Sequence, residues 1–180
     1  MKIKPWQIGL AGAGTAALIF GLSSCATLPK GAKAVRPFYI GRYLGKWYEI
    51  ARLDFRFEKN LDHVTANYSL NRDQTIRVDN KGYDKAQMKW KESIGKAKFV
   101  NAENEGRLKV SFFGPFYAGY NVIAINDDYN YAMVVGNNLK YLWLLSRDPT
   151  MPATFITKCL KHAQELGYDV SKLVWTNQGR

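Results

Sequence analysis

The stretch VTANYSL, residues 64–70, alternates apolar and polar side chains from end to end. Successive residues of a β-strand point to opposite faces of a sheet, so Val64, Ala66 and Tyr68 share one face and the polar residues between them share the other. Such alternation predicts a strand with one buried and one solvated face. Strands of this kind are typical of antiparallel sheets.

The same kind of pattern extends along the chain as short apolar segments separated by turn residues, such as Asn71-Arg72-Asp73 and Asn104-Glu105-Gly106. Strand after strand at this spacing predicts an all-β barrel or sandwich in which successive strands are hairpin neighbours. We expect eight strands, at residues 47–53, 64–70, 75–82, 88–100, 107–113, 119–125, 129–136 and 140–146.

The later strands, which contain NVIAI, AMVV and LWLL, are apolar on both faces, so another element must cover their outer side. Residues 152–166 place apolar side chains at helical spacing, and Gly167 supplies a C-terminal stop. Residues 173–175 are long enough for a short ninth strand. The prediction is therefore an eight-stranded antiparallel up-and-down barrel, shaped as a calyx, with one C-terminal α-helix packed outside.

The start of the chain has the layout of a secretion signal. Two lysines precede an apolar run at residues 8–22, which is too short to span a bilayer as a helix. Leu22-Ser23-Ser24-Cys25 then resembles the bacterial lipobox, in which the cysteine is lipidated and becomes the first residue after cleavage. We expect residues 1–24 to be a cleaved signal peptide and Cys25 to carry the lipid anchor.

Residues 25–37 are expected to form the lipidated N-terminus and a tether, because they hold few large apolar side chains and include Pro29, Gly31 and Pro37. Order should begin near Phe38, which leaves one folded domain at residues 38–180. The residue after Cys25 is not the Asp that retains a lipoprotein at the inner membrane, so the sequence predicts a lipid-anchored protein on the periplasmic face of the outer membrane.

The charge and the residue inventory limit the function classes. The net charge at pH 7 is +11, which favours anionic surfaces such as lipid head groups before nucleic acid, although solubility explains it as well. The chain has two histidines, His63 and His162, too few for a zinc site or a histidine-based triad. A calcium loop starting at Asn126 fails because Tyr131 and Asn137 stand where Gly and Glu are needed. We expect no metal and no cofactor.

Five segments carry a family resemblance: YLGKWYEIARLDFRFE, VTANYSL, KVSFFGPFYAGYNVIAI, DDYNYAMV and YLWLLSR. In this order and spacing they resemble the lipocalin family, in its branch of bacterial outer-membrane lipocalins and apolipoprotein D-like proteins. The resemblance runs from about Arg42 to Trp175. It implies a calyx that binds a small hydrophobic ligand.

The resemblance also implies residue roles. At the closed end of the barrel, Trp47 plugs the floor and the Arg147 guanidinium lies across it in a cation-π contact. These two belong to a structural motif of Gly45, Trp47, Asp127, Tyr129 and Arg147. The family's ligand contacts fall at Tyr68, Asn80 and Trp143, where Tyr68 and Asn80 would orient a polar end, and strand parity adds three aromatics that core filling explains equally well. The expected ligand-binding set is Tyr68, Asn80, Trp90, Phe112, Tyr141 and Trp143.

The open end of the barrel is expected to be rimmed by loops at residues 55–62 and 114–118. Aromatic residues beside cations in these loops suit either entry of an amphiphile from a membrane or a lid that folds back over the mouth. The aromatics are Phe55, Phe57, Phe116 and Tyr117, and the cations are Arg56 and Lys59.

The expected function is to bind, store or transport a small hydrophobic ligand, a fatty acid or lysophospholipid, without catalysis; a homodimer is left open. One alternative is a lipid- or isoprenoid-modifying enzyme that uses Cys159 or a pocket carboxylate such as Glu49. The position of Cys159 among apolar helix residues favours a buried small hydrophobe. Another alternative is a structural envelope protein with a barrel filled by side chains.

Overall fold

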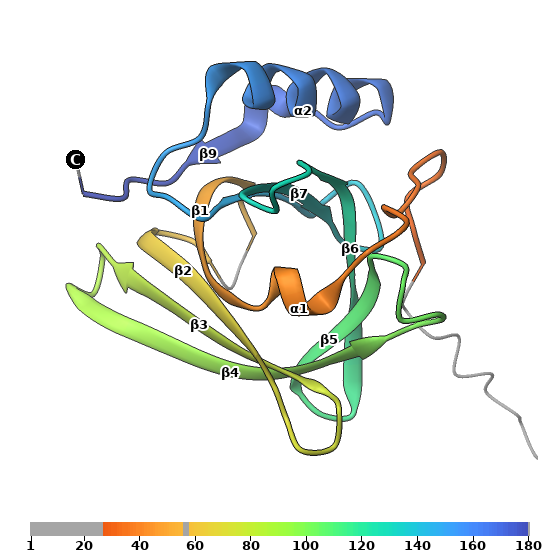
Figure 1. The fold of residues 1–180 in the computed structure, drawn as a ribbon. Coiled ribbons are helices and arrows are strands. Elements are labelled where there is room, and N and C mark those ends of the chain that lie inside the picture. The colour runs from red at the N-terminus through yellow and green to blue at the C-terminus, as the bar shows by residue number, and fades with distance from the viewer. Residues whose placement is uncertain (1–26, 56–57, 180) are drawn as a thin grey trace, which may run out of the picture.

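A computed structural model describes residues 27–55 and 58–179, and within these residues one sheet of nine strands closes on itself. The sheet order is β2-β3-β4-β5-β6-β7-β8-β1-β9, and β1 also pairs with β2, which completes an antiparallel up-and-down barrel (Figure 1). The predicted fold class is confirmed. The strands are β1 (Gly45–Leu53), β2 (Leu61–Leu70), β3 (Ile76–Asp84), β4 (Lys89–Phe99), β5 (Arg107–Phe113), β6 (Phe116–Ile125), β7 (Tyr131–Val135), β8 (Leu142–Ser146) and β9 (Leu173–Trp175).

Short helical segments flank the eight strands of the barrel in the sequence. The one-turn helix α1 (Ile40–Tyr43) precedes β1, and its four residues were not predicted because so short a helix has no periodic pattern. The helix α2 (Ala153–Glu165) follows β8, and the 3-10 turn η1 (Val170–Lys172) leads into β9. After α2, Gly167 adopts a φ of +92°, the left-handed conformation that ends helices.

Two apolar cores lie on opposite sides of the barrel wall. The inner core fills the lower barrel around Trp47, Val78 and Leu108. The outer core lies between α2 and the outer faces of the sheet, where Cys159 and Ala163 are buried in the same cluster as Met133. This arrangement explains why the later strands are apolar on both faces, and it confirms the predicted outer helix (Figure 1).

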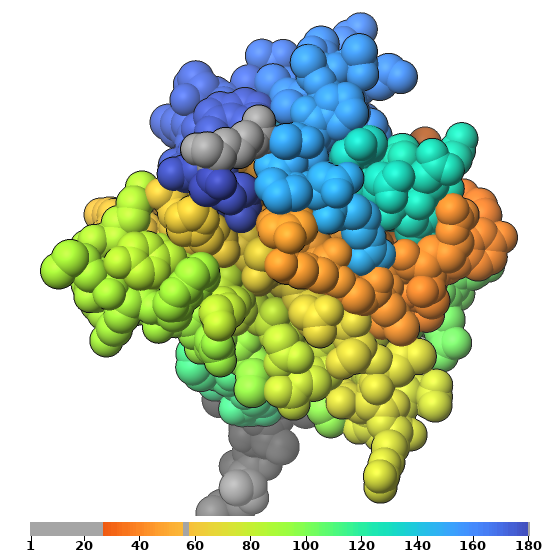
Figure 2. Space-filling view, turned by 60° about the vertical axis from the view of Figure 1, so that its left-hand side comes forward, coloured from red at the N-terminus to blue at the C-terminus, as the bar shows by residue number. Residues whose placement is uncertain are grey.

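The strand β1 pairs with three other strands along its length. Its first residues pair with β2, the stretch from Tyr48 to Arg52 pairs with β8, and its end pairs with β9. Above Tyr48, β1 therefore no longer pairs with β2. The C-terminal tail connects them there, because Thr176 N donates to Ile50 O at 3.0 Å and His63 N donates to Asn177 O at 2.8 Å. Figure 2 shows this tail, in dark blue, lying against the residues near position 60.

The predicted tether is wrong over residues 27–37, which lie along the barrel. Val35 N donates to Val122 O and Gly106 N donates to Val35 O, both at 2.9 Å, so this segment extends the hydrogen bonding of the sheet. Leu28 and Ala32 pack against the outer core. A few well-placed side chains are enough for docking when the backbone is also hydrogen-bonded. Order therefore begins before Phe38.

Several predictions fall outside the described residues. These are the signal peptide at residues 1–24, the lipidated Cys25, and Arg56 and Phe57 of the rim. Within residues 27–55 and 58–179, no helix combines the length and apolar character needed to cross a membrane.

Candidate ligand-binding site

The closed end of the barrel is built around one arginine. The Arg147 guanidinium lies 4.0 Å from the centre of the Trp47 ring, and its nitrogens donate to the carbonyls of Lys46, Arg42 and Leu44, each at 2.8 Å. Gly45 has a φ of +89°, and a Cβ there would meet Arg147 Nη1 at 3.4 Å. The cation therefore holds the start of β1 to the end of β8.

The turn between β6 and β7 meets the same floor. Arg42 Nη2 donates to Asp127 O at 2.6 Å, and the Arg42 guanidinium lies 4.3 Å from the centre of the Tyr129 ring. Tyr129 is buried, and its carbonyl accepts from Arg147 Nε. The five residues of the expected structural motif therefore lie together at the closed end, although Asp127 takes part through its backbone.

Above this floor the barrel contains a cavity in two compartments. The inner compartment has a volume of about 110 Å³ and the mouth compartment about 540 Å³. The inner walls are mainly apolar, as in Ile76, Val78 and Leu108. The two compartments share the wall residues Phe55, Glu58, Val64, Asn80, Val110 and Phe112.

Five of the six expected ligand-binding residues line this cavity. Tyr68 and Trp143 line the inner compartment, and Tyr141 lines the mouth compartment. Asn80 and Phe112 belong to both. Tyr68 lies at the bottom, where its hydroxyl is hydrogen-bonded to another tyrosine, so it is not placed to hold a head group at the mouth.

Trp90 is the exception, and its predicted inward position is wrong. The inward residues of β4 are Gly95 and Ala97, both buried, and Trp90 lies an odd number of positions from them. It is 52% exposed on the outer face, opposite Tyr83, with the ring centres 5.5 Å apart. Lys81 Nζ lies 5.1 Å from the centre of the Trp90 ring.

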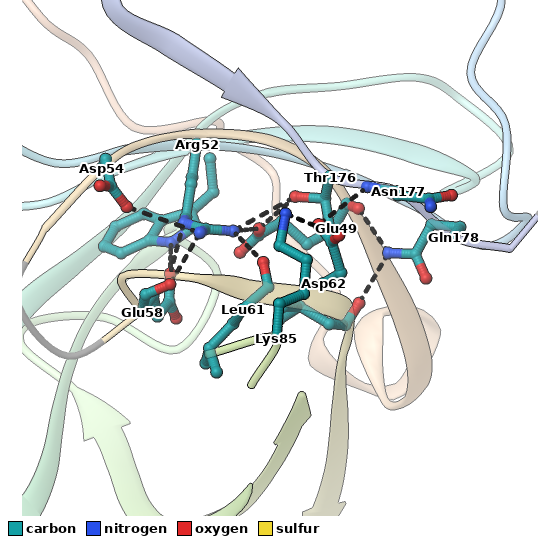
Figure 3. Close-up of polar contacts among 12 residues, drawn as sticks. Glu49, Arg52, Asp54, Glu58, Leu61, Asp62, Lys85, Thr176, Asn177 and Gln178 are labelled. Atoms are coloured by element: carbon teal, nitrogen blue, oxygen red, sulfur yellow. Dashed lines mark hydrogen bonds and ion pairs between the residues drawn. The ribbon is translucent and has the colours of Figure 1, made fainter. Parts of the chain in front are cut away.

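A buried ionic network lies where β1, the following loop and the C-terminal tail meet (Figure 3). The Arg52 side chain is 1% exposed, and its Nη1 donates to Glu49 Oε1 at 2.6 Å. Arg52 also donates to the carbonyls of Leu61 and Glu58, and its Nε lies 3.8 Å from Glu58 Oε2. Gln178 Nε2 donates to the carbonyls of Glu49 and Val64. Arg52 thus joins β1 to the following loop and to the start of β2, and Gln178 joins the C-terminal tail to the same two strands.

Glu58 connects this network to the cavity. Its Oε2 accepts a hydrogen bond from Trp143 Nε1 at 3.1 Å, and both side chains line the inner compartment. Burial, followed by repulsion from Glu49, raises the pKa of Glu58 to about 8. Glu58 is therefore largely neutral at pH 7.

The mouth compartment combines aromatic rings with cations. Phe55 folds inward, with its ring centre 5.4 Å from that of Tyr141 and 5.6 Å from that of Trp143. Phe116, by contrast, is 80% exposed at the β5–β6 turn. Lys81 and Lys91 line this compartment. The rim thus has one aromatic that closes inward and another that points to solvent.

Cys159 lies outside the barrel, on the buried face of α2 at 2% exposure, and does not line the cavity. Burial raises the pKa of its thiol to about 12, so the thiol is protonated at pH 7. Within the described residues, no group of three or more His, Cys, Asp and Glu side chains is placed to hold a metal ion.

Sequence reasoning missed Tyr43, Tyr120 and Glu58, all of which line the inner compartment. Tyr120 is paired with Leu108, which points inward. The alternation along β5 would therefore have predicted an inward Tyr120 if the length of the β5–β6 turn had been known. Tyr43 lies in α1 and Glu58 in a loop, where strand parity gives no signal.

A closed eight-stranded calyx with an apolar interior, a plugged floor and an outer helix defines a lipocalin-type binding protein. The family model described as "Lipocalin-like domain" matches residues 38–178, and the chain belongs to the lipocalin family.

Relatives agree with this assignment. The chain is 48% identical to "Outer membrane lipoprotein Blc" of Escherichia coli strain K12, over 99% of this chain and 98% of the relative. It is 46% identical to the Vibrio cholerae protein of the same name, over 87% and 92%. It is 31% identical to mouse apolipoprotein D, over 88% and 85%. The bacterial matches assign this chain to the outer membrane.

Solved structures show the same fold. The cockroach allergen Per a 4 superposes with a TM-score of 0.66 at 18% identity, over 86% of this chain and 96% of that one. Insecticyanin of the tobacco hornworm Manduca sexta gives a TM-score of 0.66 at 20% identity, over 86% and 88%.

Proposed function

We propose that this outer-membrane lipoprotein binds a single-chain amphiphile, a fatty acid or a lysophospholipid, and stores or carries it at the periplasmic face of the membrane. The observation that carries the proposal is the two-compartment cavity, whose apolar inner part opens into a wider mouth. Burial of an alkyl chain would stabilise the complex by about 25 cal/mol per Å² of apolar surface.

The polarity of the cavity suggests how such a ligand lies. Lys81 and Lys91 line the mouth compartment, and both are already paired: Lys81 Nζ lies 3.0 Å from Glu92 Oε1 and over the outer-face ring of Trp90, and Lys91 Nζ is paired with Asp84. These charged groups make the rim polar, which favours the head of an amphiphile there. The inner compartment offers an apolar wall to the alkyl chain. Because Glu58 between them is largely neutral at pH 7, it does not repel an anionic head group. The ligand therefore enters with its methyl end first and keeps its head at the mouth.

The start of the described chain supports a mouth that faces the lipid. Thr27 Oγ1 donates to Asn137 O at 3.4 Å, and Asn137 lies in the loop that leads to Tyr141 of the mouth compartment. Cys25 is only two residues before Thr27, which corresponds to a reach of about 7 Å. An anchor on Cys25 would keep the mouth near the membrane, where the exposed Phe116 could enter the interface.

Binding, rather than catalysis, is the function we propose. The thiol of Cys159 is buried outside the cavity, and Glu49 is engaged by Arg52 in the ionic network. A cavity of mainly apolar lining with a few polar groups suits recognition of a hydrophobic ligand. A homodimer stays a prediction.

The proposal is tested with a chain that starts at residue 26, since the barrel, both cores and α2 all lie within residues 27–179. Palmitic acid and a palmitoyl lysophospholipid are titrated while tryptophan fluorescence is followed. We expect a saturable change at micromolar ligand, reduced in Trp143→Phe and retained in Trp175→Phe, because Trp143 lines the cavity and Trp175 is exposed outside it. No change with either ligand contradicts the proposal.

A further inference from the structure

Three tyrosine hydroxyls form a hydrogen-bonded chain at the bottom of the inner compartment. Tyr43 Oη lies 2.6 Å from Tyr120 Oη, which lies 2.7 Å from Tyr68 Oη. The residues come from α1, β6 and β2, and all three line the compartment. Trp47 lies directly below, since its Nε1 donates to Tyr43 O and its ring centre is 4.8 Å from that of Tyr43. A polar cluster thus lies at the bottom of a mainly apolar pocket.

The three hydroxyls carry three protons but make only two hydrogen bonds with one another. Burial raises the pKa of Tyr43, Tyr68 and Tyr120, so each hydroxyl keeps its proton. Three O–H groups joined in a line use two protons for the two bonds between them. Within the part of the chain that the structure describes, these hydroxyls make no further hydrogen bond. One of the three O–H groups is therefore left to donate to a group in the compartment.

An unused acceptor lies nearer the mouth. Asn80 Oδ1 is buried and has no hydrogen-bond partner among the described residues. Asn80 is paired with Ala66, whereas Tyr68 is paired with Val78, so Asn80 lies one inward position closer to the mouth than Tyr68. The compartment therefore offers a donor at its bottom and an acceptor above it.

We propose that the inner compartment is a subsite for an oxygen at the buried end of the ligand's alkyl chain, a hydroxyl or carbonyl that accepts a hydrogen bond from the tyrosine chain. The inference rests on the proposed function, since it takes an acyl ligand in the calyx as given. A ligand that ends in a methyl group would bury the spare O–H without a hydrogen-bond acceptor, and an unsatisfied buried donor weakens binding. A site built to hydrogen-bond an oxygen discriminates against the analogue that lacks it.

The test compares palmitic acid with 16-hydroxypalmitic acid, which differ by one terminal hydroxyl, in calorimetric titrations of the chain that starts at residue 26. The test variant is Y43F/Y68F/Y120F, which removes the hydroxyls and keeps the rings. The matched control is Tyr131→Phe, whose ring packs on Phe155 outside the barrel. We expect the wild type to bind the hydroxylated acid at least as tightly as palmitic acid. The triple variant should shift the affinity ratio about tenfold towards palmitic acid, because one buried hydrogen bond is lost.

An affinity ratio that is the same in the wild type and the triple variant overturns the subsite. If neither acid binds the wild type, the proposed function itself fails, which is a separate outcome. If the triple variant does not fold, the affinities of the wild type for the two acids test the inference on their own. Moving a hydroxyl into a purely apolar pocket would weaken binding about tenfold or more. Such a loss for 16-hydroxypalmitic acid overturns the inference, and near-equal affinity supports it.

Discussion

The indole of Trp143 donates a hydrogen bond to the carboxyl group of Glu58, with 3.1 Å between Nε1 and Oε2. This bond joins β8 to the loop after β1, and both partners line the inner compartment. Glu58 also lies beside Arg52, whose Nη2 donates to its carbonyl. The ligand cavity and the buried ionic network therefore meet at two carboxyl side chains, Glu58 and Glu49, which both line the inner compartment.

Glu58 should make stability depend on pH. Its folded pKa of about 8 lies above the ordinary value of 4.5, so the folded protein holds a proton that the unfolded chain releases. The stabilisation is full below pH 4.5 and is lost as the pH rises towards 8. We expect the free energy of unfolding to fall between pH 5 and pH 8 by about 1–3 kcal/mol more in the wild type than in Glu58→Gln. Urea unfolding of both proteins measures this, and equal pH slopes would contradict the assignment.

Arg52 should be the most sensitive charge in the network. Arg52→Met removes the cation paired with buried Glu49, which keeps the Thr176 hydroxyl as a donor, and removes the donor to the carbonyls of Leu61 and Glu58. Breaking a buried ion pair by removing one partner costs about 3–5 kcal/mol, and we expect a loss of that size in denaturant unfolding. The control Arg77→Met removes an ion pair with Asp79 on the surface and should leave the midpoint unchanged. Similar losses in both variants would show that burial of the network is not the cause.

The C-terminal tail should contribute measurably to stability through Gln178. Its amide nitrogen donates to Glu49 O at 2.7 Å and to Val64 O at 2.9 Å, where β1 and β2 no longer pair. Gln178→Ala should lower the free energy of unfolding by about 1–3 kcal/mol, because both carbonyls lose a donor. Gln164→Ala, on the exposed face of α2, serves as the comparison. Thermal unfolding of the pair checks this, and equal midpoints would rule out a role for the tail in joining the strands.

Arg147 should support the fold without taking part in ligand binding. Arg147→Lys keeps the charge but loses the planar fork that reaches the carbonyls of Arg42, Leu44 and Lys46. We expect a loss of about 1–3 kcal/mol in the free energy of unfolding and an unchanged dissociation constant for palmitic acid. A variant that is fully stable but binds weakly would instead place Arg147 in the binding machinery.

The barrel could be predicted from the sequence because alternation survives wherever a strand has one polar face. Phe112 was placed in the cavity by parity with Leu108 and Val110. The same argument failed for Trp90, because the upper part of β4 is exposed on both faces and its pattern carries no inward signal. Only Gly95 and Ala97, lower on the strand, fix the parity.

The rest of the site depends on contacts between residues that are distant in the sequence. The chain of Tyr43, Tyr68 and Tyr120 is assembled from three elements, and the segment around Val35 docks through backbone hydrogen bonds that leave no side-chain pattern. In the sequence, Glu58 is a loop carboxylate like any other, and only the structure shows that it contacts Trp143 and Arg52. Such partners are set by tertiary packing.

The central claim is that an acyl chain lies inside the calyx, and photo-crosslinking tests it most directly. A palmitic acid with a diazirine near its methyl end is bound, irradiated, and mapped by mass spectrometry of the digested protein. We predict labelling of inward residues of the inner compartment, such as Tyr68, Val110 and Trp143. Labelling confined to outer-face residues such as Trp90 and Trp175, or labelling that excess unlabelled palmitic acid does not displace, would contradict the account.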